Sequence, residues 1–102
     1  MRIQFQSDGG FGFFPGLARP LDLDSARLPD DRAAELERLV QGAGFFSLPA
    51  KVGAAAPGSA DVRTYTITIE ANGRPHTVQA VEPVENPQLQ RLVEFLLAEQ
   101  RR

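Results

Sequence analysis

The stretch TYTITIEANGRPHTVQAV, Thr64 to Val81, decides the fold. Its residues alternate in polarity on both sides of Asn72-Gly73, a pair typical of a two-residue type I′ turn, in which both positions need positive φ. The register set by this turn places Tyr65, Ile67 and Ile69 opposite Ala80, Val78 and His76 on one apolar face. The other, mostly polar face then carries Thr64, Thr66, Thr68, Thr77, Gln79 and Val81, and we expect it to face solvent. A hairpin with one apolar face predicts helices on that side only.

Two further strands are predicted before this hairpin. Met1, Ile3 and Phe5 alternate with polar residues, which indicates a strand with one buried face. Leu17, Leu21 and Leu23 repeat the pattern in a second strand. Pro20 interrupts that second strand, and because proline cannot donate to the ladder, we expect it at the edge of the sheet.

Two helices are predicted from their starting signals and their apolar stripes. The first begins at Pro29, with Asp30 and Asp31 near the positive end of its dipole, and stops at Gly42 and Gly44. Its stripe is Ala33, Leu36, Leu39, Val40 and Ala43. The second begins at Asn86-Pro87, and its stripe is Leu89, Leu92, Val93, Leu96 and Leu97.

These elements predict an α+β two-layer sandwich: a four-stranded antiparallel sheet with two helices on one face, in the order ββα-ββα. The chain of 102 residues fits one domain, residues 1–102. We expect Phe45, Phe46 and Leu48 to fold back into the core after the first helix. Residues 8–16 and 50–60 are predicted to be flexible loops.

Composition excludes several classes of function. The net charge of −2 provides no electrostatic footprint for nucleic acid. The chain has no cysteine, hence no disulfide or thiol chemistry, and no apolar run near the roughly 18 residues of a membrane span. The N-terminal residues MRIQFQSD lack an apolar signal segment. We expect a cytoplasmic monomer that binds neither membranes nor nucleic acid.

Residues that could support catalysis or metal binding are scarce. His76 is the only histidine and is predicted to be structural, and zinc would need further His or Cys ligands. Asp22 and Asp24 lack a glycine-shaped loop for a hard cation, and Asp30 and Asp31 are better explained by the helix dipole. The serines have no nearby base, and the glycines do not match phosphate-binding spacings. We therefore expect a binding protein without a cofactor rather than an enzyme.

The stretch SDGGFGFFPG, Ser7 to Gly16, places three phenylalanines among four glycines. Glycine raises the entropy cost of order, whereas phenylalanine gains most from burial. Such a loop either packs under the body of the domain or keeps its rings ready to be buried in another molecule.

Across nearly its whole length the chain resembles the emfourin family, inhibitors of protealysin-like metalloproteases of the thermolysin family. The matching segments occur in the family's order: Ser7, Gly9, Gly10 and Phe11 of the Ser-x-Gly-Gly-Phe loop, LPDDRAAELERLV (28–40), FFSLPA (45–50), Pro57, Gly58 and Asp61, YTITIE (65–70), and RPHTV (74–78). The continuation FGFFPG is more aromatic than the family's usual FAG-like one.

This resemblance implies tight, reversible and non-covalent blocking of a thermolysin-like metalloprotease in the cytoplasm. Such enzymes prefer a bulky hydrophobic residue just after the cleaved bond, so the aromatic loop is expected to enter the cleft or contact its rim. The candidate protease-binding residues are Ser7, Gly9, Gly10, Phe11, Phe13, Phe14, Pro57, Gly58 and Asp61. Two alternatives stay open: the rings of Phe11, Phe13 and Phe14 cap the chain's own core, or the loop serves a regulatory protein-binding module that inhibits nothing.

Overall fold

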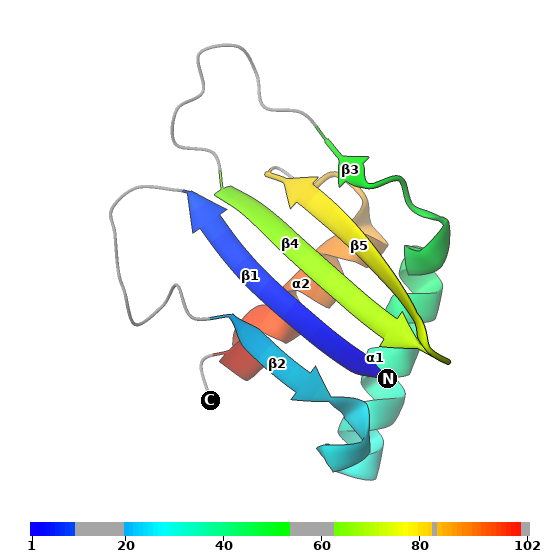
Figure 1. Cartoon of the computed structure of the whole chain (residues 1–102). Coiled ribbons are helices and arrows are strands. Elements are labelled where there is room, and N and C mark those ends of the chain that lie inside the picture. Colours follow the sequence, from blue (N-terminus) through cyan, green and yellow to red (C-terminus); the bar gives the residue numbers. More distant parts are fainter. Residues whose placement is uncertain (10–19, 54–62, 83, 101–102) are drawn as a thin grey trace.

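The computed structural model describes residues 1–9, 20–53, 63–82 and 84–100, and it consists of a sheet layered on helices (Figure 1). The strands are β1 (Arg2–Gly9), β2 (Leu21–Asp24), β3 (Lys51–Val52), β4 (Arg63–Ala71) and β5 (Arg74–Val81). The helices are α1 (Asp30–Ala43) and α2 (Pro87–Gln100), with short 3-10 turns η1 (Ser25–Arg27) and η2 (Phe45–Ser47). Among these described residues, no helix combines the length and the apolar character needed to cross a membrane.

The sheet corrects the predicted architecture. Within the described residues it has five strands in the order β2-β1-β4-β5-β3, and it is mixed, because β3 runs parallel to β5 while the other neighbours are antiparallel. The prediction of four antiparallel strands is therefore wrong, although two helices do accompany the sheet.

The additional strand β3 lies inside the segment predicted to be a loop, residues 50–60. Lys51 and Val52 pair with Gln79 and Ala80, and the amide of Gln79 donates to the carbonyl of Ala50 over 2.8 Å. Two residues are too few to show an alternating pattern, so the strand is defined only by its partner. The rest of that segment, residues 54–60, lies outside the described residues.

The β4–β5 hairpin confirms the predicted turn and register. Asn72 has φ 56° and Gly73 has φ 75°, as a type I′ turn requires. Ile69 pairs with His76 and Ile67 with Val78, so the apolar side chains share one face. The predicted edge position of the second strand is also confirmed, because β2 lies at one end of the strand order. However, β2 begins at Leu21, so Pro20 precedes the strand, and Leu17 lies outside the described residues.

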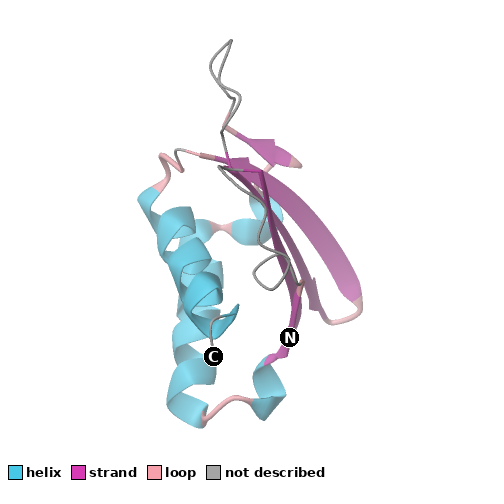
Figure 2. Cartoon of the chain, turned by 90° about the vertical axis from the view of Figure 1, so that its left-hand side faces the viewer, coloured by secondary structure: helices cyan, strands magenta, loops and turns pink. Residues whose placement is uncertain are grey.

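Both helices cover the same face of the sheet (Figure 2). Asp30 and Asp31 occupy the first turn of α1, and Gly44 ends the helix with φ 60° and ψ 42°, the left-handed conformation that glycine tolerates best. Asn86 caps α2 through its side-chain oxygen, which accepts hydrogen bonds from the amides of Gln88 (3.0 Å) and Leu89 (3.3 Å). The predicted helix starts at Pro29 and Asn86 are thus confirmed.

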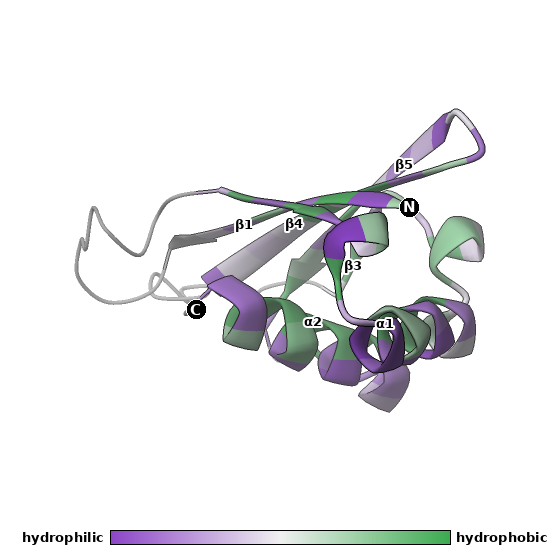
Figure 3. Ribbon diagram, turned by 90° about the horizontal axis from the view of Figure 1, so that it is seen from below, coloured by the Kyte–Doolittle hydropathy of each residue, from purple (hydrophilic) through white to green (hydrophobic). Residues whose placement is uncertain are grey.

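The core lies between the sheet and the helices, where the hydrophobic sides of both layers meet (Figure 3). Its largest fully buried side chains are Phe5, Phe45, Ile3, Leu36, Ile67, Ile69, Leu89, Leu92, Leu96 and Val78. Phe45 joins this core as predicted, but Phe46 does not, because 45% of its surface is exposed. The prediction that Phe46 is a core residue is therefore wrong.

An ion pair also joins the two helices. The Arg32 guanidinium of α1 contacts the carboxylate of Glu99 on α2, and it lies 4.8 Å from the centre of the Phe95 ring. The Glu99 side chain is 7% exposed, so this link between α1 and α2 is largely shielded from water.

Candidate functional site

The end of β1, the start of β4 and the end of β5 lie together at one end of the sheet (top of Figure 1). β1 ends at Gly9, which pairs with Arg63, the first residue of β4. Just after β5, the amide of Glu82 donates to the carbonyl of Arg63 over 3.0 Å. We call this region, defined by Gly9, Arg63 and Glu82, the β1–β4 end.

A buried tyrosine braces the β1–β4 end. The ring of Tyr65 is 4% exposed and stacks on Phe5, with the ring centroids 5.9 Å apart and the planes 14° from parallel. Its hydroxyl donates a hydrogen bond to Oε1 of Glu82. The chain after β5 is thus tied to β4 by the backbone bond to Arg63 and by this side-chain bond. The predicted position of Tyr65 on the apolar face of the hairpin is confirmed.

The Tyr65 hydroxyl is expected to ionise at a higher pH than a free tyrosine. Burial, the hydrogen bond to Glu82 and the negative charge of Glu82 together raise the pKa of Tyr65 above its ordinary 10.0, while Arg63 opposes the shift. Because the raised pKa favours the protonated group in the folded state, its contribution to stability is complete below pH 10 and is lost as the pH rises through the folded pKa.

Tyr65 is the only tyrosine in the chain, so an ultraviolet absorbance titration reports this group alone. We expect the midpoint in the folded protein to exceed the midpoint in urea, and Glu82→Gln to move it back toward the unfolded value. A folded midpoint at or below the unfolded one would contradict this account.

The structure describes few of the predicted site residues. Ser7 is half-buried in β1 and pairs with Tyr65, which places it on the helix-covered face, and Gly9 is the last residue of β1. The others lie outside the described residues: Gly10, Phe11, Phe13, Phe14, Pro57, Gly58 and Asp61. What the structure does show is that the described residues flanking these segments, Gly9 and Arg63, are direct partners in the sheet.

Three residues considered for catalysis or metal binding, His76, Asp22 and Asp24, have structural partners. His76 donates from Nε2 to the carbonyl of Leu48 over 2.9 Å. Asp22 pairs with Arg2 over 3.1 Å, a hydrogen bond that lowers the pKa of Asp22, and Asp24 accepts from the amide of Ala26 at the start of η1. Within the described part of the chain, no group of three or more His, Cys, Asp or Glu residues could hold a metal ion.

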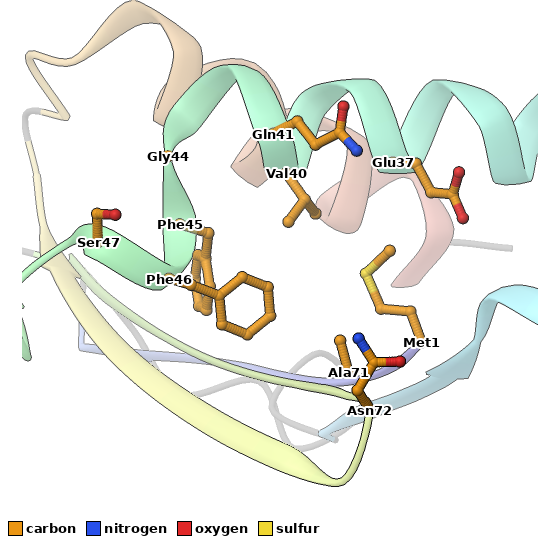
Figure 4. Close-up of a pocket in the computed structure, with 10 residues that line it drawn as sticks. All are labelled: Met1, Glu37, Val40, Gln41, Gly44, Phe45, Phe46, Ser47, Ala71 and Asn72. Carbon is orange, nitrogen blue, oxygen red and sulfur yellow. The ribbon is translucent and has the colours of Figure 1, made fainter.

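A second candidate region lies at the opposite end of the sheet, beside the hairpin turn. There a cleft of about 510 Å³ opens between α1, η2 and the turn (Figure 4). We call it the Phe46 cleft, and its lining residues are Met1, Glu37, Val40, Gln41, Gly44, Phe45, Phe46, Ser47, Ala71 and Asn72. Sequence reasoning missed it because it assigned Phe46 to the core.

Comparison with models of known protein families identifies the family of this chain. A sequence model of the Emfourin family matches residues 5–97. The chain belongs to the emfourin family. This confirms the resemblance drawn from the sequence, and the match spans every element from the middle of β1 into α2. Comparison with curated proteins and with solved structures gave no significant match.

Membership of the emfourin family suggests a metalloprotease inhibitor and a partner that is a protease. This role agrees with a protein that acts by binding rather than by catalysis. The family match covers the β1–β4 end and every lining residue of the Phe46 cleft except Met1, so it does not by itself choose between them as the contact surface.

Proposed function

We propose that this emfourin inhibits a protealysin-like or thermolysin-like zinc metalloprotease by blocking the active-site cleft sterically and reversibly. The single observation that carries the proposal is the family match over residues 5–97. The proposed contact residues are Ser7, Gly9, Gly10, Phe11, Phe13, Phe14, Pro57, Gly58 and Asp61, with the aromatic glycine-rich loop as the main contact. The proposed site of action is the cytoplasm, in agreement with a chain that has no cysteine.

The geometry of the β1–β4 end supports a contact surface built from both segments. Residues 10–14 follow Gly9 directly, and residues 57–61 end just before Arg63. Because Gly9 and Arg63 are antiparallel partners, their Cα atoms are about 4.5–5.5 Å apart. One protease cleft would therefore meet two segments that begin or end at adjacent positions of the sheet.

The proposed mechanism relies on burial of aromatic side chains. A phenylalanine that becomes desolvated in a partner's pocket is a typical hot spot, worth about 2 kcal/mol or more on truncation. Glycines beside it permit close approach of the two backbones. The hydrophobic preference of thermolysin-like enzymes just after the cleaved bond suits such an anchor.

We do not expect this protein to remove zinc from the protease. The chain has no cysteine, and its single histidine is hydrogen-bonded to Leu48. Inhibition would therefore leave the zinc in the enzyme, and adding excess zinc to the inhibited complex would not restore activity.

The direct test is titration of the protein into a protealysin-like protease from the same source, with peptide hydrolysis as the readout. We expect activity to fall to near zero as the inhibitor reaches the enzyme concentration, and to recover when the complex is diluted, because binding is non-covalent. Full hydrolysis at micromolar inhibitor, despite a measurable complex, would instead support the regulatory binding module.

A further inference from the structure

The turn of the β4–β5 hairpin places an asparagine before a glycine in an open position. Asn72 and Gly73 are both exposed, with φ values of 56° and 75°. Apart from the chain neighbours of Gly73, nothing lies within 4 Å of the point where a Cβ on this residue would stand. Among the described residues no hydrogen bond holds the side-chain amide of Asn72, so this amide is free to react.

The turn also lacks a covering layer. The Phe46 cleft, of about 510 Å³, lies between α1 and the turn, and Asn72 is one of its lining residues (Figure 4). The ladder of the hairpin ends at the pair Ala71 and Arg74, and the amide of Gly73 donates to no backbone carbonyl of the described residues. Both reacting groups, the side-chain amide of Asn72 and the backbone nitrogen of Gly73, are therefore open to water.

An asparagine and the glycine after it can react with each other. The Gly73 nitrogen attacks Cγ of Asn72, the Cγ–Nδ2 bond breaks, and Nδ2 leaves as ammonia with the proton of the Gly73 amide. Water then opens the resulting succinimide ring at either of its carbonyls, which gives aspartate or isoaspartate. Glycine permits the attack because it has no Cβ to shield its nitrogen. Water is the only co-reactant.

From these features we infer that Asn72-Gly73 is a site of spontaneous deamidation in the folded protein, and that the isoaspartate product weakens the β4–β5 hairpin. Ring closure needs a rotation of Asn72 out of its left-handed conformation, so the reaction proceeds while the turn is open. None of residues 70–75 is buried, and opening a short exposed segment of this kind costs little free energy.

The two products differ in their effect on the turn. Aspartate fits the same geometry, because Asp-Gly is one of the pairs that a type I′ turn prefers. Isoaspartate routes the backbone through Cβ and Cγ of residue 72, so it adds one carbon to a two-residue loop whose length sets the register of β4 on β5. The last pairs of the hairpin must then shift or separate.

This inference does not depend on the proposed inhibition. Arg63, at the β1–β4 end, is eight residues from Ala71 along β4, which corresponds to about 27 Å of strand. Deamidation at the turn would therefore leave the proposed protease-binding end unchanged.

The chain provides an internal control for the reaction. Its only other asparagine, Asn86, is followed by Pro87, whose nitrogen carries no proton and cannot close the same ring. One tryptic peptide, residues 64–91, contains both asparagines, because the bond between Arg74 and Pro75 resists trypsin. Its fragment ions report each asparagine separately.

The test incubates the folded protein at neutral pH, with a parallel sample in urea, and follows this peptide by mass spectrometry. We expect a gain of one mass unit at Asn72 and none at Asn86. The rate should rise with pH, because the attacking nitrogen must lose its proton. The folded chain should react no more than about tenfold more slowly than the chain in urea, since the turn opens at low cost.

Thermal unfolding of the separated products tests the effect on the hairpin. The isoaspartate form should melt about 5–10 °C below the unmodified protein. Asn72→Asp keeps the turn and should melt within about 3 °C of it. Asn72→Gly also keeps the turn, because Gly-Gly suits the type I′ geometry, and it removes the reacting amide. This variant should show no fall in melting temperature during the incubation.

Three results would overturn the inference. Reaction in urea without reaction in the folded protein would show that the turn protects Asn72. Equal conversion of Asn72 and Asn86 would rule out attack by the Gly73 nitrogen. An isoaspartate form that melts with the unmodified protein would show that the hairpin tolerates the extra carbon. If Asn72→Gly does not fold, the comparison of the two asparagines in the unsubstituted chain still decides whether the site reacts.

Discussion

Replacing Phe11 by alanine is expected to weaken inhibition of the cognate metalloprotease about 30-fold or more, which corresponds to a hot spot of about 2 kcal/mol. The physical reason is that the proposed anchor loses its buried area in the protease cleft. The melting temperature should change little, because in the proposed mechanism Phe11 is buried by the protease and not by its own domain. Inhibition constants from peptide hydrolysis and thermal unfolding of the free protein measure the two effects separately.

Phe46→Ala is the matched control for this substitution. It removes the same ring from an exposed position at the other end of the sheet, so inhibition should stay within about twofold of the original, as for surface changes away from an interface. Phe13→Ala and Phe14→Ala then rank the three rings of the loop. A Phe11→Ala variant that melts far lower would show that its ring belongs to the core, and unchanged inhibition with unchanged stability would remove it from the contact surface.

Replacing Phe45 by alanine should reduce the free energy of unfolding by about 3–5 kcal/mol. Phe45 is 1% exposed and packs edge-on against both Phe46 and His76, with centroids 5.6 Å away in each case. Alanine would leave a cavity where η2 meets the sheet. For a domain of this size the melting temperature should fall by about 12 °C or more.

The neighbouring residue again provides the comparison. Phe46→Ala should cost less than about 1 kcal/mol, because nearly half of its surface is already in contact with water. Urea unfolding of both variants measures the difference directly. If Phe45→Ala does not fold, Phe45→Leu keeps most of the volume and should lose about 1–2 kcal/mol. Equal losses from the two alanine variants would contradict the burial that the structure shows.

Local signals carried most of the fold that could be predicted from the sequence. The Asn72-Gly73 turn needs only two residues with positive φ, and the alternation on each side determines which side chains face the helices. The cap at Asn86 and the left-handed Gly44 likewise depend on a few adjacent residues. These signals do not depend on the rest of the molecule, so the sequence alone is enough to detect them.

The features that escaped prediction depend on distant partners. Strand β3 forms because Lys51 and Val52 pair with the edge of β5 at Gln79 and Ala80. Two residues are too short to show the alternating polarity that identifies a strand in the sequence. Phe45 and Phe46 look equivalent in the sequence, yet the left-handed residue Gly44 starts η2 so that only Phe45 points into the core. The bonds between Tyr65 and Glu82 and between Arg32 and Glu99 also join residues that no short pattern relates.

For the candidate site, the sequence supplied the family and the residues to test. The structure added that Gly9 and Arg63, which border the two predicted contact segments, pair in the sheet. Ser7 and Gly9 lie in β1, which extends beyond the alternation predicted up to Phe5 and includes Gly9 from the segment predicted to be a loop, residues 8–16. The pairing of Gly9 with Arg63 could not be read from the sequence, because more than fifty residues separate them and the order of strands was unknown.

The pairing of Gly9 with Arg63 has a consequence for how emfourins could diversify. The two proposed contact segments adjoin Gly9 and Arg63, which pair in the sheet, so under the proposed mechanism their sequences could change while the described core stays the same. Even doubling the length of such a connection costs only about 0.6 kcal/mol in closure entropy. Under this mechanism, the target protease could be changed by replacing these two short segments while the rest of the fold is kept, either in evolution or by laboratory selection.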